Sequence, residues 1–151
     1  MSQNHYMAEA LSEAQAAAAD GEIPVGAVIV DSTTGEIIAR GSNATEAIND
    51  PTAHAEMMVI QQACKLKGAP RLPECDIYVT LEPCPMCATA ISFARLRRVY
   101  FGAYDPKGGG VDHGPKIFQQ PTCHHQPEIY GGIDEQACAV LLKEFFRDRR
   151  V

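Results

Sequence analysis

The sequence predicts an α/β fold, a three-layer α/β/α sandwich built on one mixed five-stranded sheet. Apolar residues near the N-terminus recur with helical spacing, and short apolar strands alternate with helical segments from residue 50 onward. This alternation implies parallel strands in a sheet that is covered by helices on both faces. The 151 residues, of which 46% are hydrophobic, suffice for a substantial core. No shift in composition marks a linker, so we expect a single domain over residues 1–151.

The first elements are predicted to be a helix and a hairpin. Apolar residues 7, 10, 11 and 14 follow the i, i+3, i+4, i+7 pattern of an amphipathic helix, which we expect to end at Gly21. The runs PVGAVIVD and GEIIARGS have the composition of strands. They are joined through residues 31–35, which end in glycine, and this predicts a β-hairpin.

The later elements follow from the same patterns. A second helix is expected to begin directly after Asp50-Pro51-Thr52, a polar cap with a proline near the first helical position, and to continue to about Lys67. Glycine and proline between residues 106 and 121 indicate a long loop with a helical turn. The runs CDIYVTLE, RRVYFGA and PEIYGGI predict three more strands, PCPMCATAISFAR predicts a helix, and residues 135 to about 149 predict the last helix.

The composition argues against a membrane-spanning or exported protein. No apolar run approaches the roughly 18 residues that cross a bilayer, and the N-terminal run MSQNHYMAEALSEAQ lacks a basic leader and an apolar signal core. Six cysteines without an export signal are expected to be reduced thiols, so we expect a cytoplasmic location. The net charge is −6, but residues 65–151 hold twelve bases and ten acids, which permits a basic surface in this half.

Two cysteines carry the first sign of chemistry. Cys84 and Cys87 lie three residues apart at the expected start of a helix, so their side chains share one face of its first turn. The helix dipole favours thiolate there, the form that binds metals. Alone, this spacing also fits a redox pair or a structural zinc site. With His54 it becomes a Cys₂His set that leaves one tetrahedral position open, the pattern of a catalytic zinc ion.

His54 and Glu56 are only two residues apart, so on the side of a helix they would point away from each other. They can serve one site only at the N-terminal tip of the helix. We therefore predict that the tips of two helices converge on one metal ion. Glu56 is then a carboxylate that takes a proton from zinc-activated water and delivers it to a substrate nitrogen. The alternative is an exposed glutamate that merely favours the helix dipole.

The motifs TAHAE and EPCPMC resemble those of the zinc-dependent cytidine-deaminase superfamily. GEIPVGAVIV, NDPTAHAE, RVYFGAYDPK and LLKEFFRDRR are moreover similar to the bacterial tRNA adenosine deaminases, and the resemblance covers about residues 6 to 150. It implies a cytidine-deaminase-like fold, one Zn²⁺ per subunit, a homodimer, and deamination of adenosine to inosine at the wobble position of a tRNA anticodon loop. It also implies that His54, Cys84 and Cys87 hold the zinc and that Glu56 transfers protons.

The same resemblance implies a set of substrate contacts. Asn43 would bond the nucleoside, and Pro24 and Val25 would line the base pocket. For each contact a purely structural reading stays open, since these residue types are also common in turns, cores and solvated surfaces. The RNA-facing residues would be Asp105 and Lys107 in a loop, and Phe145, Phe146, Arg147, Arg149 and Arg150 in the last helix.

One segment departs from the family pattern. The usual Gly-Ser pair reads Asp112-His113, and an Asn-His pair reads His124-His125. This keeps an alternative substrate class open, a free base or nucleoside such as guanine or cytosine, converted by the same zinc centre. A non-catalytic zinc protein is disfavoured, because such a protein has no use for Glu56 beside an open metal position. A second metal site at residues 123–125 is not expected, since no further ligands are suggested.

Overall fold

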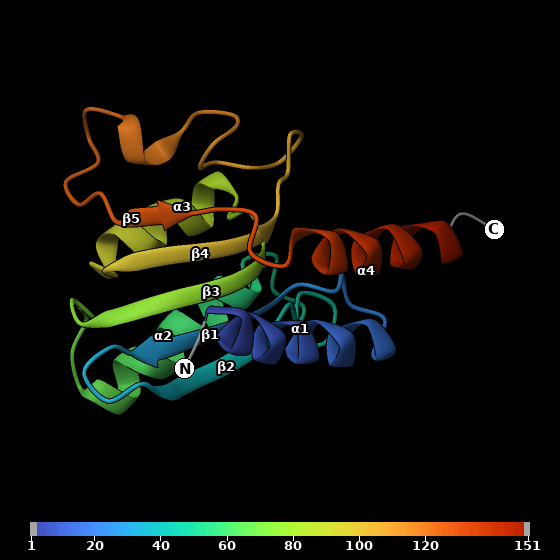
Figure 1. The fold of residues 1–151 in the computed structure, drawn as a ribbon, viewed down its shortest axis with the longest axis horizontal. Coiled ribbons are helices and arrows are strands. Elements are labelled where there is room, and N and C mark those ends of the chain that lie inside the picture. Colours follow the sequence, from blue (N-terminus) through green and yellow to red (C-terminus); the bar gives the residue numbers. More distant parts are fainter. Residues whose placement is uncertain (1–2, 150–151) are drawn as a thin grey trace.

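The structure is a computed structural model in which residues 3–149 are described, and it contains a five-stranded sheet between two pairs of helices (Figure 1). The predicted three-layer sandwich is therefore confirmed. No helix within the described part of the chain is long and apolar enough to cross a membrane. The strands are β1 (Gly26–Asp31), β2 (Glu36–Ser42), β3 (Cys75–Leu81), β4 (Arg98–Ala103) and β5 (Glu128–Tyr130); the helices are α1 (Gln3–Ala19), α2 (Ala55–Lys67), α3 (Pro85–Phe93), α4 (Glu135–Asp148) and the short 3₁₀ turn η1 (Ile117–Gln119).

The sheet is mixed, with the strand order β2-β1-β3-β4-β5. β1 runs antiparallel to both β2 and β3, whereas β3, β4 and β5 are parallel. In the parallel part, Asp76 of β3 pairs with Arg98 of β4, which pairs with Glu128 of β5. The carboxyl ends of parallel strands meet at one edge of a sheet, which is where α/β proteins bind ligands. The segments after β3 and β4 therefore leave the sheet side by side.

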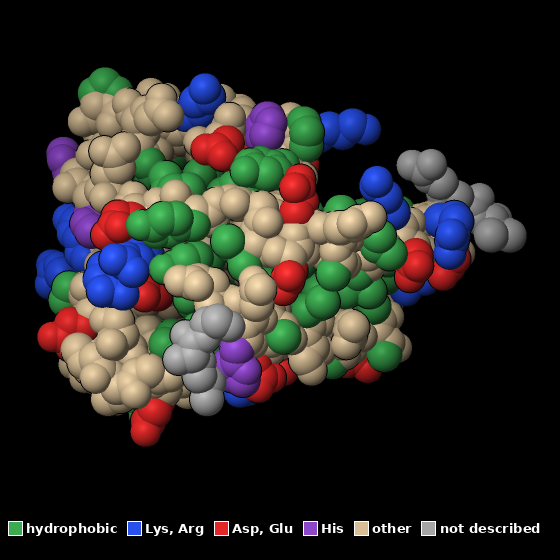
Figure 2. Space-filling view, in the orientation of Figure 1, with side chains coloured by type: hydrophobic (Ala, Val, Ile, Leu, Met, Phe, Trp, Pro, Cys, Tyr) green, Lys and Arg blue, Asp and Glu red, His purple; other side chains and the backbone are tan. Residues whose placement is uncertain are grey.

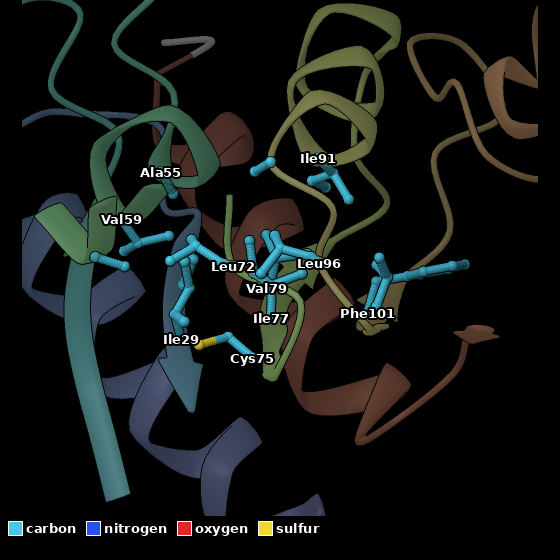
Figure 3. Close-up of a cluster of buried hydrophobic side chains, with 14 of the residues drawn as sticks. Ile29, Ala55, Val59, Leu72, Cys75, Ile77, Val79, Ile91, Leu96 and Phe101 are labelled. Carbon is cyan, nitrogen blue, oxygen red and sulfur yellow. The ribbon is translucent and has the colours of Figure 1, made fainter. Parts of the chain in front are cut away.

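Two cores flank the sheet, because successive side chains of a strand point to opposite faces. α1 and α4 cover one face, where Tyr6 and Met7 pack against Val28 and Tyr78. α2 and α3 cover the other face. There, side chains of both helices meet those of the central strands, as Figure 3 shows. The labelled residues on that side include Ala55, Val59, Ile77, Val79 and Ile91.

α2 begins two residues later than predicted, and the reason is a competing turn. The Oδ1 atom of Asp50 accepts hydrogen bonds from both the N–H and the O–H of Thr52, at 2.8 and 2.7 Å. Such a turn offers the backbone an alternative to the helix. α2 begins at Ala55, with His54 as its N-cap. The Ala55 N–H, which has no partner within the helix, donates to Asn43 Oδ1 at 2.8 Å.

A buried carboxylate ties the hairpin to α2. Asp31, at the end of β1, forms an ion pair with Lys67 at the end of α2 and accepts hydrogen bonds from the N–H and O–H of Thr33. The hydrogen bond from Lys67, followed by those from Thr33, lowers the pKa of Asp31 from 3.8 to about 2. A carboxylate with a lowered pKa in the folded state stabilises that state above its unfolded pKa.

We expect Asp31→Asn to lower the free energy of unfolding by about 1–2 kcal/mol at pH 7, a range that allows for solvent screening at the partly exposed Lys67. The difference from the wild type should shrink as the pH falls from about 4 to about 2. Urea unfolding of both proteins between pH 7 and pH 2.5 measures this. A difference that stays constant over the whole range would contradict the assignment.

Candidate active site

The N-termini of α2 and α3 converge, as the sequence predicted. His54 is the N-cap of α2 and Cys84 is the N-cap of α3, where Pro85 occupies the first helical position. Cys87 lies in the first turn of α3 and is buried. His54 Nδ1 lies 3.6 Å from Cys84 Sγ and 3.5 Å from Cys87 Sγ. One cluster thus combines side chains that are thirty residues apart in the sequence.

This cluster fits a tetrahedral zinc ion. Zinc binds thiolate sulfur at about 2.3 Å and imidazole nitrogen at about 2.0–2.1 Å, and a tetrahedral angle then separates nitrogen and sulfur by about 3.6 Å. The separations of 3.5 and 3.6 Å agree with that geometry. Soft thiolates with an imidazole are also ligands that zinc prefers. Within residues 3–149, this is the one group of three or more histidine, cysteine or acidic side chains placed to hold a metal.

The two thiols differ in their protonation. The hydrogen bond from Cys87 lowers the pKa of Cys84 to about 5, against the opposing effect of burial. The same hydrogen bond and burial raise the pKa of Cys87. Of the two thiols, Cys84 is therefore the one that more readily forms the thiolate, the form that binds zinc.

Glu56 lies in the first turn of α2, two residues after His54, and is only 4% exposed. Burial raises the pKa of its carboxyl to about 7, although its own backbone N–H opposes this. Its neighbours His54 and Cys84 line the same cavity. The alternative of an exposed surface glutamate is therefore wrong.

These side chains open into a cavity of about 270 Å³, a size suited to one heterocyclic base with part of its sugar. His54 and Cys84 of the metal cluster line it together with Glu56. Its walls come from the segment before β1, the loop after β2, and the segments that follow β3 and β4. The lining residues are Ile23, Val25, Asn43, His54, Glu56, Leu81, Glu82, Cys84, Asp105 and Gly108.

Of the three residues expected to hold the base and nucleoside, two line the cavity and one does not. Asn43 lines the cavity, and since its oxygen caps α2, its amide NH₂ is the group it can offer to a ligand. Val25 also lines the cavity. Pro24 is buried, and Ile23, which the sequence interpretation missed, lines the cavity instead. Glu22, also buried, accepts the N–H of Ala47 at 2.7 Å and so holds the loop that follows Asn43.

A second, larger groove adjoins the cavity. It has a volume of about 530 Å³ and shares Ile23, Leu81, Asp105 and Gly108 with the cavity. Lys107, on the loop after β4, lines one wall, while Lys143 and Phe146 of α4 line the other. In Figure 2 the outline of the molecule is hollowed between α4 and the part of the chain above it.

Arg147 and Arg149 lie at the C-terminal end of α4, and neither lines the cavity. Arg147 is exposed and pairs with Asp148 at 3.5 Å. The guanidinium of Arg149 lies 4.0 Å from the centre of the Phe145 ring. Arg150, the last of the expected contacts, lies outside the described residues.

Of the three histidines at positions 113, 124 and 125, two have partners within the fold. His113 Nδ1 lies 2.8 Å from Glu82 Oε1, and His125 Nε2 lies 2.6 Å from the carbonyl oxygen of Leu96. His124 is exposed. Within residues 3–149, none of these three histidines belongs to a group of three or more side chains placed to hold a metal.

A His-Cys-Cys cluster with an open fourth position, beside a buried glutamate at the tips of two helices, defines a zinc-dependent deaminase. The family model described as "cytidine and deoxycytidylate deaminase zinc-binding region" matches residues 1–103. The tRNA-specific adenosine deaminase of Agrobacterium fabrum is 54% identical over 147 residues, which are 97% of this chain and 95% of that protein. The chain belongs to the cytidine and deoxycytidylate deaminase family and, within it, to the tRNA-specific adenosine deaminases.

Solved structures agree with this assignment. A structure from a study of A-to-I editing by tRNA:A34 deaminases superimposes with a TM-score of 0.90 at 54% identity, over 93% of this chain and all of that one. A guanine deaminase from Bacillus subtilis is less similar, with a TM-score of 0.66 at 34% identity over 86% of this chain and 85% of that one. The predicted activity class is confirmed: the chain is a hydrolytic deaminase with one zinc ion per subunit as its cofactor.

Proposed function

We propose that residues 1–151 form one deaminase domain that converts adenosine to inosine at the wobble position of a tRNA anticodon stem-loop. The observation that carries this proposal is a cavity for one base, lined by Glu56 and by His54 and Cys84 of the metal cluster, next to a groove with a lysine on either wall. The 54% identity to a protein named tRNA-specific adenosine deaminase supports the choice of substrate.

In this proposal His54, Cys84 and Cys87 hold the zinc ion, which supplies Lewis acidity and an activated water at neutral pH. The buried carboxylate of Glu56 takes a proton from the attacking water and delivers it to N1 of the purine. It then takes the remaining proton from the oxygen that was added at C6 and passes it to the amino group, which leaves C6 as ammonia while the C6 carbonyl forms. The NH₂ group of Asn43 holds the nucleoside, and Val25, backed by Pro24, packs against the base.

The groove would hold the RNA on either side of the target base. An anticodon loop presents unstacked bases, so placing one of them in the cavity requires no melting of a duplex. Lys107 and Lys143 on the two walls are suited to phosphate oxygens. Asp105 lines both spaces and shapes the loop that carries Lys107. Arg147 and Arg149 would extend the basic surface at the end of α4. Arg150, which is also proposed to contact RNA, lies outside the described residues.

We further propose a homodimer in the cytoplasm, where tRNA is edited. The resemblance to the family supports the dimer. Phe93 at the end of α3 is 70% exposed, which leaves an apolar side chain for a second copy to cover.

The direct test is an assay of the zinc-loaded protein with an anticodon stem-loop that carries adenosine at the wobble position. We expect inosine at that position and at no other adenosine of the loop. With about three phosphate contacts, kcat/KM should fall roughly ten- to twentyfold between 50 and 200 mM salt. Turnover of free adenosine, guanine or cytosine without any inosine in the RNA would contradict the proposal and indicate a small-molecule deaminase.

A further inference from the structure

Glu82 directly follows β3, and its side chain is fully buried, yet the proposed chemistry does not use it. Its Oε1 atom accepts the N–H of Asp105 at 3.0 Å and lies 2.8 Å from His113 Nδ1. Its Oε2 atom accepts the N–H groups of Val111, Asp112 and His113 at 3.2, 3.0 and 3.1 Å. All five donors come from the segment 105–113. Because they occupy both oxygens, this carboxylate is not free to bind a metal or to take a proton from a substrate.

Three consecutive glycines, residues 108–110, allow the segment 105–113 to approach Glu82 and the N-terminus of α3 closely. A Cβ atom at Gly109 would lie 2.4 Å from Glu82 Oε2, and one at Gly110 would lie 2.6 Å from the backbone nitrogen of Pro85. The N–H of Gly110 also donates to the carbonyl of Pro83 at 2.8 Å. The segment is therefore pressed against the N-terminus of α3, the helix that presents Cys84.

The same segment forms part of both ligand spaces. Asp105 and Gly108 line the cavity, and Lys107 lines the groove. Asp105 Oδ1 accepts the N–H of Gly108 at 2.9 Å and that of Lys107 at 3.3 Å, which folds the tip of the segment. Glu82 thus holds both ends of the segment 105–113, and Asp105 shapes the tip between them.

We propose that Glu82 is a positioning residue whose carboxylate fixes the segment 105–113, so that the cavity wall and the groove wall are in place before the substrate binds. This inference rests on the proposed function for its substrate. His113 strengthens the clamp, because its ring adds a side-chain donor to the four backbone N–H groups. A site that is ordered in advance loses less entropy when it binds its ligand.

The test compares Glu82→Gln with Glu74→Gln. Glu74 is an exposed glutamate at the other end of β3 and serves as the matched control. In Glu82→Gln, an NH₂ group, which is itself a donor, replaces one carboxylate oxygen that now accepts two or three hydrogen bonds. We expect hydrogen exchange of the amides in residues 105–113 to rise at least tenfold in Glu82→Gln, with no change in α2. KM for the stem-loop should rise about tenfold, kcat should fall no more than threefold, and zinc should remain at one per subunit.

Graded variants separate positioning from mere folding. His113→Ala removes one donor of five, so both the exchange rate and KM should rise two- to threefold. If Glu82→Gln does not fold, Gly109→Ala, which crowds the same oxygen, takes its place. Unchanged hydrogen exchange of residues 105–113 in Glu82→Gln would overturn the inference. Faster exchange with an unchanged KM would also overturn it, and so would a loss of zinc that accounts for all of the lost activity. If the wild type does not act on the stem-loop, the proposed function fails. The exchange data, with kinetics on the small substrate that is turned over, still decide the role of Glu82.

Discussion

Replacing Glu56 by alanine is expected to lower kcat by about 10³-fold or more, while zinc content and fold stay intact. A positioned acid–base group contributes about 10²–10⁴-fold, and in the proposed reaction Glu56 serves more than one proton transfer. Glu56 is only 4% exposed and lies beside the metal cluster, so bulk water cannot readily take over its proton transfers. Inosine formation under single-turnover conditions, together with zinc per subunit and thermal unfolding, measures the outcome.

Glu56→Gln is the matched control, because it keeps the shape of the side chain but cannot transfer a proton. It should be as inactive as the alanine variant. Neither replacement should reduce stability much, since burial already disfavours the charged form of this carboxyl. Turnover within tenfold of the wild type in either variant would refute the assigned proton transfer.

Replacing Cys87 by serine is expected to weaken zinc binding by about 10³-fold or more and to remove activity with it. Zinc binding is worth roughly 10–16 kcal/mol in structural sites, so the loss of one of three protein ligands costs several kcal/mol. Cys87 is completely buried at the tip of α3, where a serine hydroxyl is a poor zinc ligand and no neighbouring cysteine replaces the thiol. Competition with a chromogenic chelator measures the zinc affinity.

Cys64→Ser is the control, because Cys64 is a free thiol on α2 outside the cluster. It should keep one zinc ion and full activity. In the cobalt-substituted protein, the thiolate absorption should weaken for Cys87→Ser and persist for Cys64→Ser. A Cys87→Ser protein that retains wild-type zinc affinity would show that this thiolate is not a ligand.

The elements were largely predictable because the patterns that predict them are local. Alternating apolar residues and helical spacing report which face of a segment is buried, whatever it packs against. The start of α2 was not predictable in the same way. Two contacts decide it. One is the turn closed by the side chain of Asp50, and the other is the hydrogen bond from the Ala55 N–H to the side chain of Asn43, twelve residues earlier in the chain. The second is a tertiary contact that no local pattern reports.

The site residues divide in a similar way. Ile23 and Glu82 went unnoticed because an apolar residue before a strand and a glutamate after one have no unusual sequence context. For Asp105 the resemblance predicts a contact with RNA, and the structure adds a second role, because its carboxylate accepts backbone hydrogen bonds that fold its own loop. One signal was present for Glu82: it comes directly after a buried strand and two residues before a metal-binding cysteine.

By itself, the sequence determined the chemistry: a histidine, two cysteines and a glutamate with spacings that can work together only at helix tips. Only the tertiary structure decided that the two tips meet. Parallel pairing of β3 with β4 brings the chain back to the same edge of the sheet, and burial of α2 and α3 on one face aligns their N-termini. It also decided which side chains enclose the substrate. The physical reason is that residue type sets what a group can do, whereas distance between remote groups is set by the packing of the whole sheet.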